Sequence, residues 1–414
     1  MNDKLVSIFC LTYNHVDYIR DALEGFVKQK TNFQYEVFVY DDASTDGTSE
    51  CIQEYASRYP QLFNIYISPY NTYNSPDRFK ILNELQHKYI TGKYVAMCEG
   101  DDYWIDSKKL QMQVDYMEEH DNCMMTTHAY KKINYSNKGV DEISFADIDR
   151  NLTKEEIITN PQINLATSSL IMRRKVFFRD DKFPKCDVGD IPRQLYALSY
   201  GDIYYFNRVM SVYRYMHKGS WTSDTFLNPY KFVKHKIGFV QFLTEYNIYS
   251  SRKFENLVWQ KIKAYLYSVV ENIMELDINK RNEVLKYVES YGYLGTEIIR
   301  VYRSMCGESE EVKNLLYDSA KKFNIVILGA GKYSFCIEKM LKKLDTEYFK
   351  VITKKDENHR GVITLSEYPY EQEKTIIIVG ISQLKEQEIL SSLAGKKYKK
   401  IIYPLWFNRE ILMR

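Results

Sequence analysis

The first 120 residues alternate between short apolar runs and segments in which apolar residues recur every three or four positions. The runs Leu5–Cys10 and Tyr35–Tyr40 have the β-branched and aromatic content typical of strands. The same reading predicts further strands at residues 62–68 and 93–98, and helices at residues 14–30, 48–59 and 79–90. This alternation predicts a parallel, doubly wound α/β sheet, whose ligand site lies at the carboxyl ends of the strands.

The pattern changes twice further along the chain. Residues 121–214 loosen into short strands and loops, for example at 166–172 and 202–206, and we expect this segment to form the opposite wall of the ligand site. Residues 228–320 are mainly helical in pattern, and from Phe323 onward strand and helix alternate again, which predicts a small Rossmann-like domain. We therefore expect three parts, at residues 1–225, 226–321 and 322–414.

Three carboxylates in four residues follow the apolar run Tyr94–Met97. They are Glu99, Asp101 and Asp102, and the predicted strand places them together at one edge of the sheet. Such a concentration of negative charge is unfavourable unless a cation lies among the carboxylates. Oxygen ligands without a thiol or imidazole cluster suit Mn²⁺ or Mg²⁺. The cluster therefore predicts a divalent metal site.

Composition excludes several partner classes. The 57 basic and 55 acidic residues give a net charge of +2, so no overall field attracts nucleic acid or an anionic membrane. No apolar run approaches the about 20 residues that a transmembrane helix needs, and the expected location is the cytoplasm. Seven dispersed cysteines without a CxxC pair predict reduced thiols and no structural zinc.

Two further segments carry a family resemblance. Val6–Asn14 ends in the turn Thr12-Tyr13-Asn14, and Val39–Thr48 contains Asp41, Asp42 and Asp46. Together with the acid cluster, these segments resemble the family 2 glycosyltransferases of the GT-A fold, over residues 4–222. The family usually has glycine where Ala43 stands.

The resemblance implies a nucleotide site at the first two strand ends, formed by Thr12, Tyr13 and Asn14 with the second segment. Tyr13 would stack on the base and Asp42 would accept a base N–H, while Asp41 and Asp46 would support the turn.

The resemblance also assigns roles in the acid cluster. Asp101 would hold the metal, and Glu99 or Asp102 would contact ribose, a metal-bound water or a sugar hydroxyl. Asp102 and His217 are further candidate metal ligands. In the closing segment, Arg214 or Lys218 would meet the diphosphate, and Trp221 would stack on the sugar or the acceptor.

A transfer with inversion needs a base that deprotonates the acceptor hydroxyl. The best match to the acidic motif of the family is Asp190, which we expect to cap a helix that has Pro192 at an early position. Asp187 is the alternative base.

A glycine-rich loop follows the first strand of the C-terminal domain. Gly329 and Gly331 match a dinucleotide fingerprint, but Ser334 stands where the fingerprint has its third glycine. Nucleotide binding and a scaffold role both remain open for this domain.

These observations predict a metal-dependent inverting glycosyltransferase that uses a nucleoside-diphosphate sugar, with a UDP-sugar as the expected donor. The acceptor would be a glycan, a lipid-linked precursor or a protein in bacterial surface-structure biosynthesis, and the helical region could support a homo-oligomer. The alternatives are a nucleotide-sensing scaffold with a catalytically silent GT-A fold and a sugar-phosphate nucleotidyltransferase. The latter needs a glycine-rich basic loop after the first strand, where this chain has Leu11–His15.

Overall fold

The computed structural model describes residues 5–160, 165–186, 189–319, 322–354, 362–369 and 371–413. The chain forms two compact units. The first contains residues 1–227 and 249–252, and the second contains residues 228–248 and 253–414. Helices of the second unit and its sheet thus lie in one compact body, and the division of this region into two domains stays a prediction.

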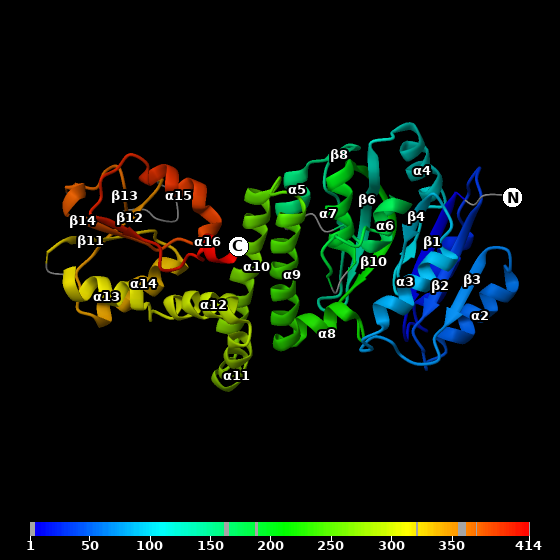
Figure 1. The fold of residues 1–414 in the computed structure, drawn as a ribbon, viewed down its shortest axis with the longest axis horizontal. Coiled ribbons are helices and arrows are strands. Elements are labelled where there is room, and N and C mark those ends of the chain that lie inside the picture. The colour runs from blue at the N-terminus through cyan, green and yellow to red at the C-terminus, as the bar shows by residue number, and fades with distance from the viewer. Residues whose placement is uncertain are drawn as a thin grey trace. The chain divides into compact units, whose positions relative to one another are not determined.

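The first unit is an α/β structure built on one large sheet (Figure 1). Its strands are β1 (Val6–Thr12), β2 (Tyr35–Asp41), β3 (Phe63–Ile67), β4 (Tyr94–Met97), β5 (Tyr103–Trp104), β6 (Cys123–Asn134), β7 (Gly139–Ile143), β8 (Arg150–Leu152), β9 (Ile171–Arg173) and β10 (Asp202–Tyr215). Its helices are α1 (Ile19–Val27), α2 (Thr48–Arg58), α3 (Arg78–Tyr89), α4 (Lys109–Glu119), α5 (Lys154–Thr159), α6 (Arg174–Phe177), α7 (Asp190–Tyr200), α8 (Trp221–Leu227) and the 3₁₀ turn η1 (Thr167–Ser169).

The predicted parallel sheet covers only part of this unit. Strands β3, β2, β1 and β4 are adjacent and parallel, as expected. The sheet then continues through β9, β6, β10 and β5, and β9 pairs antiparallel with both β4 and β6. The expectation of short strands over residues 121–214 is wrong for β6 and β10, which are 12 and 14 residues long and extend the same sheet.

Burial of apolar side chains explains the parallel half of the sheet. Val6, Ile8 and Cys10 of β1 and Val37 and Val39 of β2 are fully buried in the main core. The buried face of α1 packs on the same core, and it consists of Ile19, Ala22, Leu23 and Phe26 at helical spacing. Both strands are therefore held rigidly up to their last residues.

Three strand ends meet at one edge of this sheet. Thr12 at the end of β1 pairs with Asp41 at the end of β2, and Phe9 pairs with Met97 at the end of β4. Beyond β4, the amide of Gly100 donates to Leu11 O at 2.9 Å. A Cβ on Gly100 would lie 2.4 Å from Thr12 Oγ1, so only glycine allows this close approach. The segments after β1, β2 and β4 therefore come together.

The second unit contains helices and a separate parallel sheet. Its helices are α9 (Pro229–Tyr249), α10 (Glu255–Glu275), α11 (Ile278–Glu289), α12 (Gly292–Met305), α13 (Glu310–Ser319), α14 (Lys332–Lys343), α15 (Glu386–Leu393), α16 (Arg409–Leu412) and the 3₁₀ turns η3 (Gln372–Lys374) and η4 (Gln383–Lys385). Its strands are β11 (Asn324–Leu328), β12 (Phe349–Ile352), β13 (Ile363–Thr364), β14 (Thr375–Val379) and β15 (Lys400–Ile402).

The second sheet has the strand order β13-β12-β11-β14-β15, with all pairs parallel. The first strand is central, as doubly wound folds require, and Figure 1 shows α14 and α15 on opposite faces of the sheet. Helix α10 is fastened to the carboxyl ends of these strands. Lys263 bonds Gln383 O at 3.1 Å and Glu386 at 2.6 Å, and Tyr267 donates its hydroxyl to Leu405 O at 2.7 Å.

Two general expectations concern the whole described chain. None of the described helices is both long and apolar enough to cross a membrane. All seven cysteines, which lie in the described residues, are free thiols.

Ala43 provides a test of backbone strain in the turn after β2. Its φ is +65°, in the left-handed region where a Cβ costs roughly 1–2 kcal/mol. Replacement of Ala43 by glycine should raise the free energy of unfolding by roughly 0.5–1 kcal/mol, after subtraction of the entropy that glycine loses on folding. Urea unfolding measures the change. Ala56→Gly inside α2 is the control and should lower the free energy of unfolding by about 1 kcal/mol. If both variants lowered the free energy of unfolding equally, Ala43 would not be strained.

Candidate functional site

The carboxylate of Asp102 is bound inside the protein. Its side chain is buried, and Oδ1 accepts the backbone N–H of Arg214 at 2.8 Å. Burial, followed by the negative charge of Asp101, raises the pKa of Asp102 well above the ordinary range for aspartate. Asp102 therefore links the loop after β4 to β10, and its role as a metal ligand stays a prediction.

Arg214 connects the same loop to α1. Its guanidinium donates to Asp101 O at 2.7 Å and to Asp21 Oδ2 at 2.5 Å. The guanidinium carbon also lies 5.0 Å from the ring centre of Tyr18 and 4.5 Å from that of Tyr103. The side chain is only 7% exposed. These contacts hold Arg214 within the protein, and its contact with a diphosphate stays a prediction.

Asp101 faces two imidazoles. His217 Nε2 lies 2.9 Å from Asp101 Oδ2, and His15 Nε2 lies 3.9 Å from the same oxygen. Burial alone would raise the pKa of Asp101, but the hydrogen bond with His217 and the charge of His15 lower it below the ordinary value. Burial also lowers the pKa of His15. A carboxylate that stays ionised beside an imidazole provides an oxygen and a nitrogen that can both bind a cation.

The turn after β2 is held by its own side chains. Asp41 accepts hydrogen bonds from the hydroxyls of Ser44 and Ser49. Asp46 accepts from the amides of Val16 at 3.1 Å and Thr48 at 3.0 Å. Both carboxylates therefore have the supporting contacts that the resemblance implies.

The first strand end joins this turn. Asn14 has a φ of +53°, and its side-chain oxygen accepts the amide of Thr45 at 2.9 Å. Its own amide donates to Ser44 Oγ at 2.8 Å. Thr12 is buried, and its hydroxyl lies 3.1 Å from His15 Nδ1. Thr12 and Asn14 thus fix the backbone on both sides of Tyr13.

Asp42 and Tyr13 are the two predicted base contacts, and they differ in exposure. Asp42 is buried, and its Oδ1 accepts from Thr72 N at 2.8 Å, Thr72 Oγ1 at 2.6 Å and Tyr40 Oη at 3.1 Å. Tyr13 is 44% exposed, so its ring is available for stacking.

Asp190 begins α7, and Gly189 occupies the N-cap position that the sequence assigned to Asp190. Burial raises the pKa of Asp190 above the ordinary value, and backbone N–H groups at the helix start oppose the rise. The negative charge of Asp190 also contributes to the raised pKa of Glu99, after burial and Asp101. The structure therefore brings Asp190 close to the acid cluster, from the opposite half of the unit. Asp187 lies outside the described residues.

Two other predicted residues lie near the end of β10. Lys218 is exposed, and Trp221 is the first residue of α8 with 40% of its side chain exposed. Both follow His217 closely in the chain, but neither has a described contact with Asp101.

Three residues of the site were not predicted from the sequence: His15, Asp21 and Thr72. His15 directly follows the Thr12-Tyr13-Asn14 turn, so adjacency was an available signal. No sequence signal pointed to Asp21 or Thr72, because their hydrogen-bond partners, Arg214 and Asp42, are far away in the chain.

The glycine-rich loop of the second unit binds an internal carboxylate. Gly329 has a φ of +132°, and a Cβ there would lie 2.8 Å from Gly380 O. At the start of α14, Lys332 Nζ and Tyr333 Oη bond Glu271 Oε1 of α10, at 2.6 and 2.8 Å. Ser334 donates its hydroxyl to Gly331 O at 2.8 Å. The side chains of Lys332 and Tyr333 thus bond an internal carboxylate, and nucleotide binding by this loop stays a prediction.

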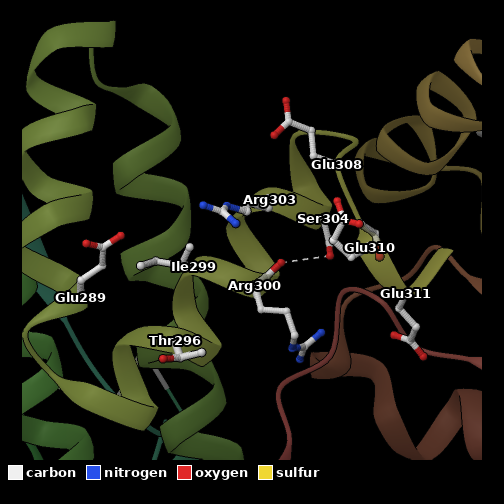
Figure 2. A pocket seen from close by; sticks show the side chains of 10 residues that line it. Glu289, Thr296, Ile299, Arg300, Arg303, Ser304, Glu308, Glu310 and Glu311 are labelled. Atoms are coloured by element: carbon white, nitrogen blue, oxygen red, sulfur yellow. Dashed lines mark hydrogen bonds between the residues drawn. The ribbon is translucent and has the colours of Figure 1, made fainter. Parts of the chain in front are cut away.

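A cavity of about 350 Å³ lies in the second unit, between α11, α12 and the start of α13. Figure 2 shows Arg300 and Arg303 among its lining, with glutamates around them. Arg300 is already bonded to Glu297 and to Pro404 O. The cavity contains none of the predicted site residues.

Comparisons with known proteins bear on the first unit. Residues 7–180 match the family model for glycosyl transferase family 2. The uncharacterized protein Rv1520 of Mycobacterium tuberculosis is 34% identical over 218 residues, which are 53% of this chain and 61% of that protein. The putative teichuronic acid biosynthesis glycosyltransferase TuaG of Bacillus subtilis is 29% identical over 163 residues, which are 39% of this chain and 60% of that protein.

A solved structure shares the fold. The crystal structure of S. aureus TarS, residues 1–349, matches with a TM-score of 0.51 and 16% identity, and the match covers 73% of this chain and 84% of that one. This likeness confirms the GT-A fold class. The chain spans about three fifths of the length of the curated relatives that it matches.

The contacts of Arg214 predict its effect on stability. Arg214→Lys keeps the charge but removes the planar fork that bonds both Asp21 and Asp101 O. We expect a loss of about 2 kcal/mol in the free energy of unfolding, measured in urea. Arg20→Lys is the control, because the Arg20–Glu54 pair is exposed on both sides and should contribute little. Equal effects of the two substitutions would contradict the role assigned to Arg214.

Proposed function

From the glycosyl transferase family 2 domain that the chain carries at residues 7–180, we propose that this protein is a metal-dependent inverting glycosyltransferase. It transfers a sugar from a nucleoside-diphosphate sugar, with UDP as the expected nucleotide, to a hydroxyl of an acceptor in bacterial surface-structure biosynthesis. The observation that supports this best is the meeting of three strand ends, which brings Tyr13, Asp42 and Asp101 to one edge of the sheet.

The residues present fit a divalent cation. Asp101 and His217 would hold it, because an ionised carboxylate oxygen and an imidazole nitrogen already lie 2.9 Å apart. Among the described residues, no group of three or more His, Cys, Asp or Glu side chains is arranged to hold a metal. Diphosphate oxygens and water would therefore complete the coordination, which suits Mn²⁺ or Mg²⁺. When bound, the cation supplies positive charge to the leaving diphosphate.

Asp42 and Tyr13 would bind the nucleotide base. The three hydrogen bonds to the Asp42 carboxylate are all accepted by Oδ1. None of the described residues donates to Oδ2, so this oxygen can accept a base N–H. Thr72 orients this carboxylate, so it belongs to the proposed nucleotide site. The exposed ring of Tyr13 would stack on the base.

Asp190 would act as the base. Its carboxylate takes the proton from the acceptor hydroxyl as the hydroxyl oxygen attacks the anomeric carbon, and the bond to the diphosphate breaks on the opposite face. The raised pKa of Asp190 makes it a better proton acceptor than an ordinary aspartate. The effect of its charge on the pKa of Glu99 supports a position near the proposed donor site.

The acceptor class rests on the relatives. TuaG is named as a putative enzyme of teichuronic acid biosynthesis, which favours a cell-surface polymer or its lipid-linked precursor. A protein with a serine, threonine or tyrosine hydroxyl is the other class of acceptor that we propose.

The proposal is tested by nucleotide release from a panel of UDP- and GDP-sugars. We expect release by the full chain with Mn²⁺ and none with EDTA, with recovery when excess Mn²⁺ is restored. Absence of both donor binding and release with every sugar would overturn the proposal.

Two substitutions separate the roles of the carboxylates. Asp190→Asn should lower the transfer rate by about 10²–10⁴-fold and leave the Kd of the donor unchanged, because it removes only the base. Asp101→Asn should weaken Mn²⁺ and donor binding by at least about tenfold. Calorimetry and nucleotide release measure the two effects. Asp141→Asn, on the exposed strand β7, is the control. Normal transfer by Asp190→Asn would move the base to another residue.

A further inference from the structure

Two arginines close to the proposed base have nitrogen atoms without a partner. Arg193 Nε and Arg179 Nη1 are both buried, and neither has a hydrogen-bond partner among the described residues. Buried donors are nearly always bonded, and an unbonded charged donor is costly. The partly buried Arg173 shows the usual outcome, because it bonds three backbone oxygens, Cys123 O, Met117 O and His120 O.

The guanidinium of Arg193 is positioned beside Asp190. A Cβ on Gly189 would lie 2.1 Å from Arg193 Nη1, so the guanidinium packs directly against the backbone of the residue before Asp190. Gly189 has a φ of −105°, which any residue adopts, so a side chain here would only require the Arg193 guanidinium to move. The ring of Phe177 supports the guanidinium, with its centre 4.7 Å from the guanidinium carbon.

The positive charges of Arg193 and Arg179 disfavour each other, and an anion would reduce this repulsion. Burial and the positive charge of Arg179 lower the pKa of Arg193 to about 9, while Asp190 and Glu99 oppose this change. Burial likewise lowers the pKa of Arg179. Two guanidiniums that repel each other while their buried donors stay unbonded are stabilised by an anion that both can contact.

We propose that Arg193 and Arg179 form a subsite for an oxyanion, a phosphate or carboxylate group, carried by the acceptor next to the hydroxyl that reacts. This inference rests on the proposed function, because Asp190 defines where that hydroxyl lies. Arg193 follows Asp190 by three residues on α7, so the two side chains lie on the same face of the helix. An anion bound to the guanidinium of Arg193 would therefore lie close to the hydroxyl that Asp190 deprotonates. The substrate class is therefore a polyanionic surface polymer or its charged precursor. A carboxylate on the donor sugar has the same chemistry, and the experiment separates the two sources.

The first test compares matched acceptors with the full chain, Mn²⁺ and the donor that releases nucleotide. The pairs are glycerol 1-phosphate against glycerol and methyl glucuronoside against methyl glucoside. We expect kcat/KM to be about 10–100-fold higher for the charged member of at least one pair. The ratio should fall at least tenfold in Arg193→Met and Arg179→Met but not in Lys175→Met, which removes an exposed charge of α6. If the charge preference instead separates UDP-glucuronate from UDP-glucose, the anion belongs to the donor, and the assignment to the acceptor is wrong.

The second test needs no acceptor. Because buried Arg193 Nε stays unbonded in the free protein, Arg193→Met should raise Tm by about 2–4 °C, whereas loss of a structural arginine would lower it. Phosphate added to the protein with Mn²⁺ and UDP should raise the Tm of the wild type more than chloride of equal ionic strength, and this difference should vanish in Arg193→Met.

The outcomes separate the two proposals. Nucleotide release without any preference for charged acceptors, together with a lowered Tm of Arg193→Met, would overturn the anion subsite and leave the transferase proposal standing. Absence of release and of donor binding would overturn both.

Discussion

The hydrogen bonds of Arg214 and Asp102 are the constraint on which the site depends. Asp102 accepts the backbone amide of Arg214, and the side chain of Arg214 reaches back to Asp101 O and to Asp21 of α1. Three segments that are far apart in the chain are thereby fixed around one loop. The loop can then present the Asp101 carboxylate to His217 in a defined direction. Without these bonds, repulsion within the acid cluster would favour separation of the carboxylates, and the geometry near Asp101 would be lost.

Chemically equivalent carboxylates acquire different roles from their surroundings. Asp102 is buried against a backbone amide and has a raised pKa, whereas Asp101 is kept ionised by imidazoles. Asp190 has a raised pKa at the start of a helix, where backbone N–H groups limit the rise. The site thus combines a structural acid, a candidate ligand and a candidate base. The three carboxylates differ in pKa because different elements of the fold contact each of them.

The parallel half of the fold was predictable because buried parallel strands leave continuous apolar runs in the sequence. β1, β2, β3 and β4 all lie at the expected positions, and their ends locate the site. The second half was not predictable in this way. β6 and β10 contain buried Thr126, His128 and Arg214, so they lack the alternation that marks a strand. Sequence also cannot distinguish Asp101 from Asp102, since their difference arises from Arg214 and His217, more than 110 positions away. The assigned roles of the site residues stay predictions.

The bonds between α10 and the second sheet have a consequence for the history of the chain. Lys263 and Tyr267 bond backbone oxygens in the segments that follow β14 and β15, and Glu271 bonds the side chain of Lys332 at the start of α14. A gene fragment that encoded the sheet without α10 would yield a product with exposed aromatic surface and unsatisfied polar groups. Recombination would therefore tend to transmit the helices and the second sheet as one block, joined to or separated from the first unit as a whole.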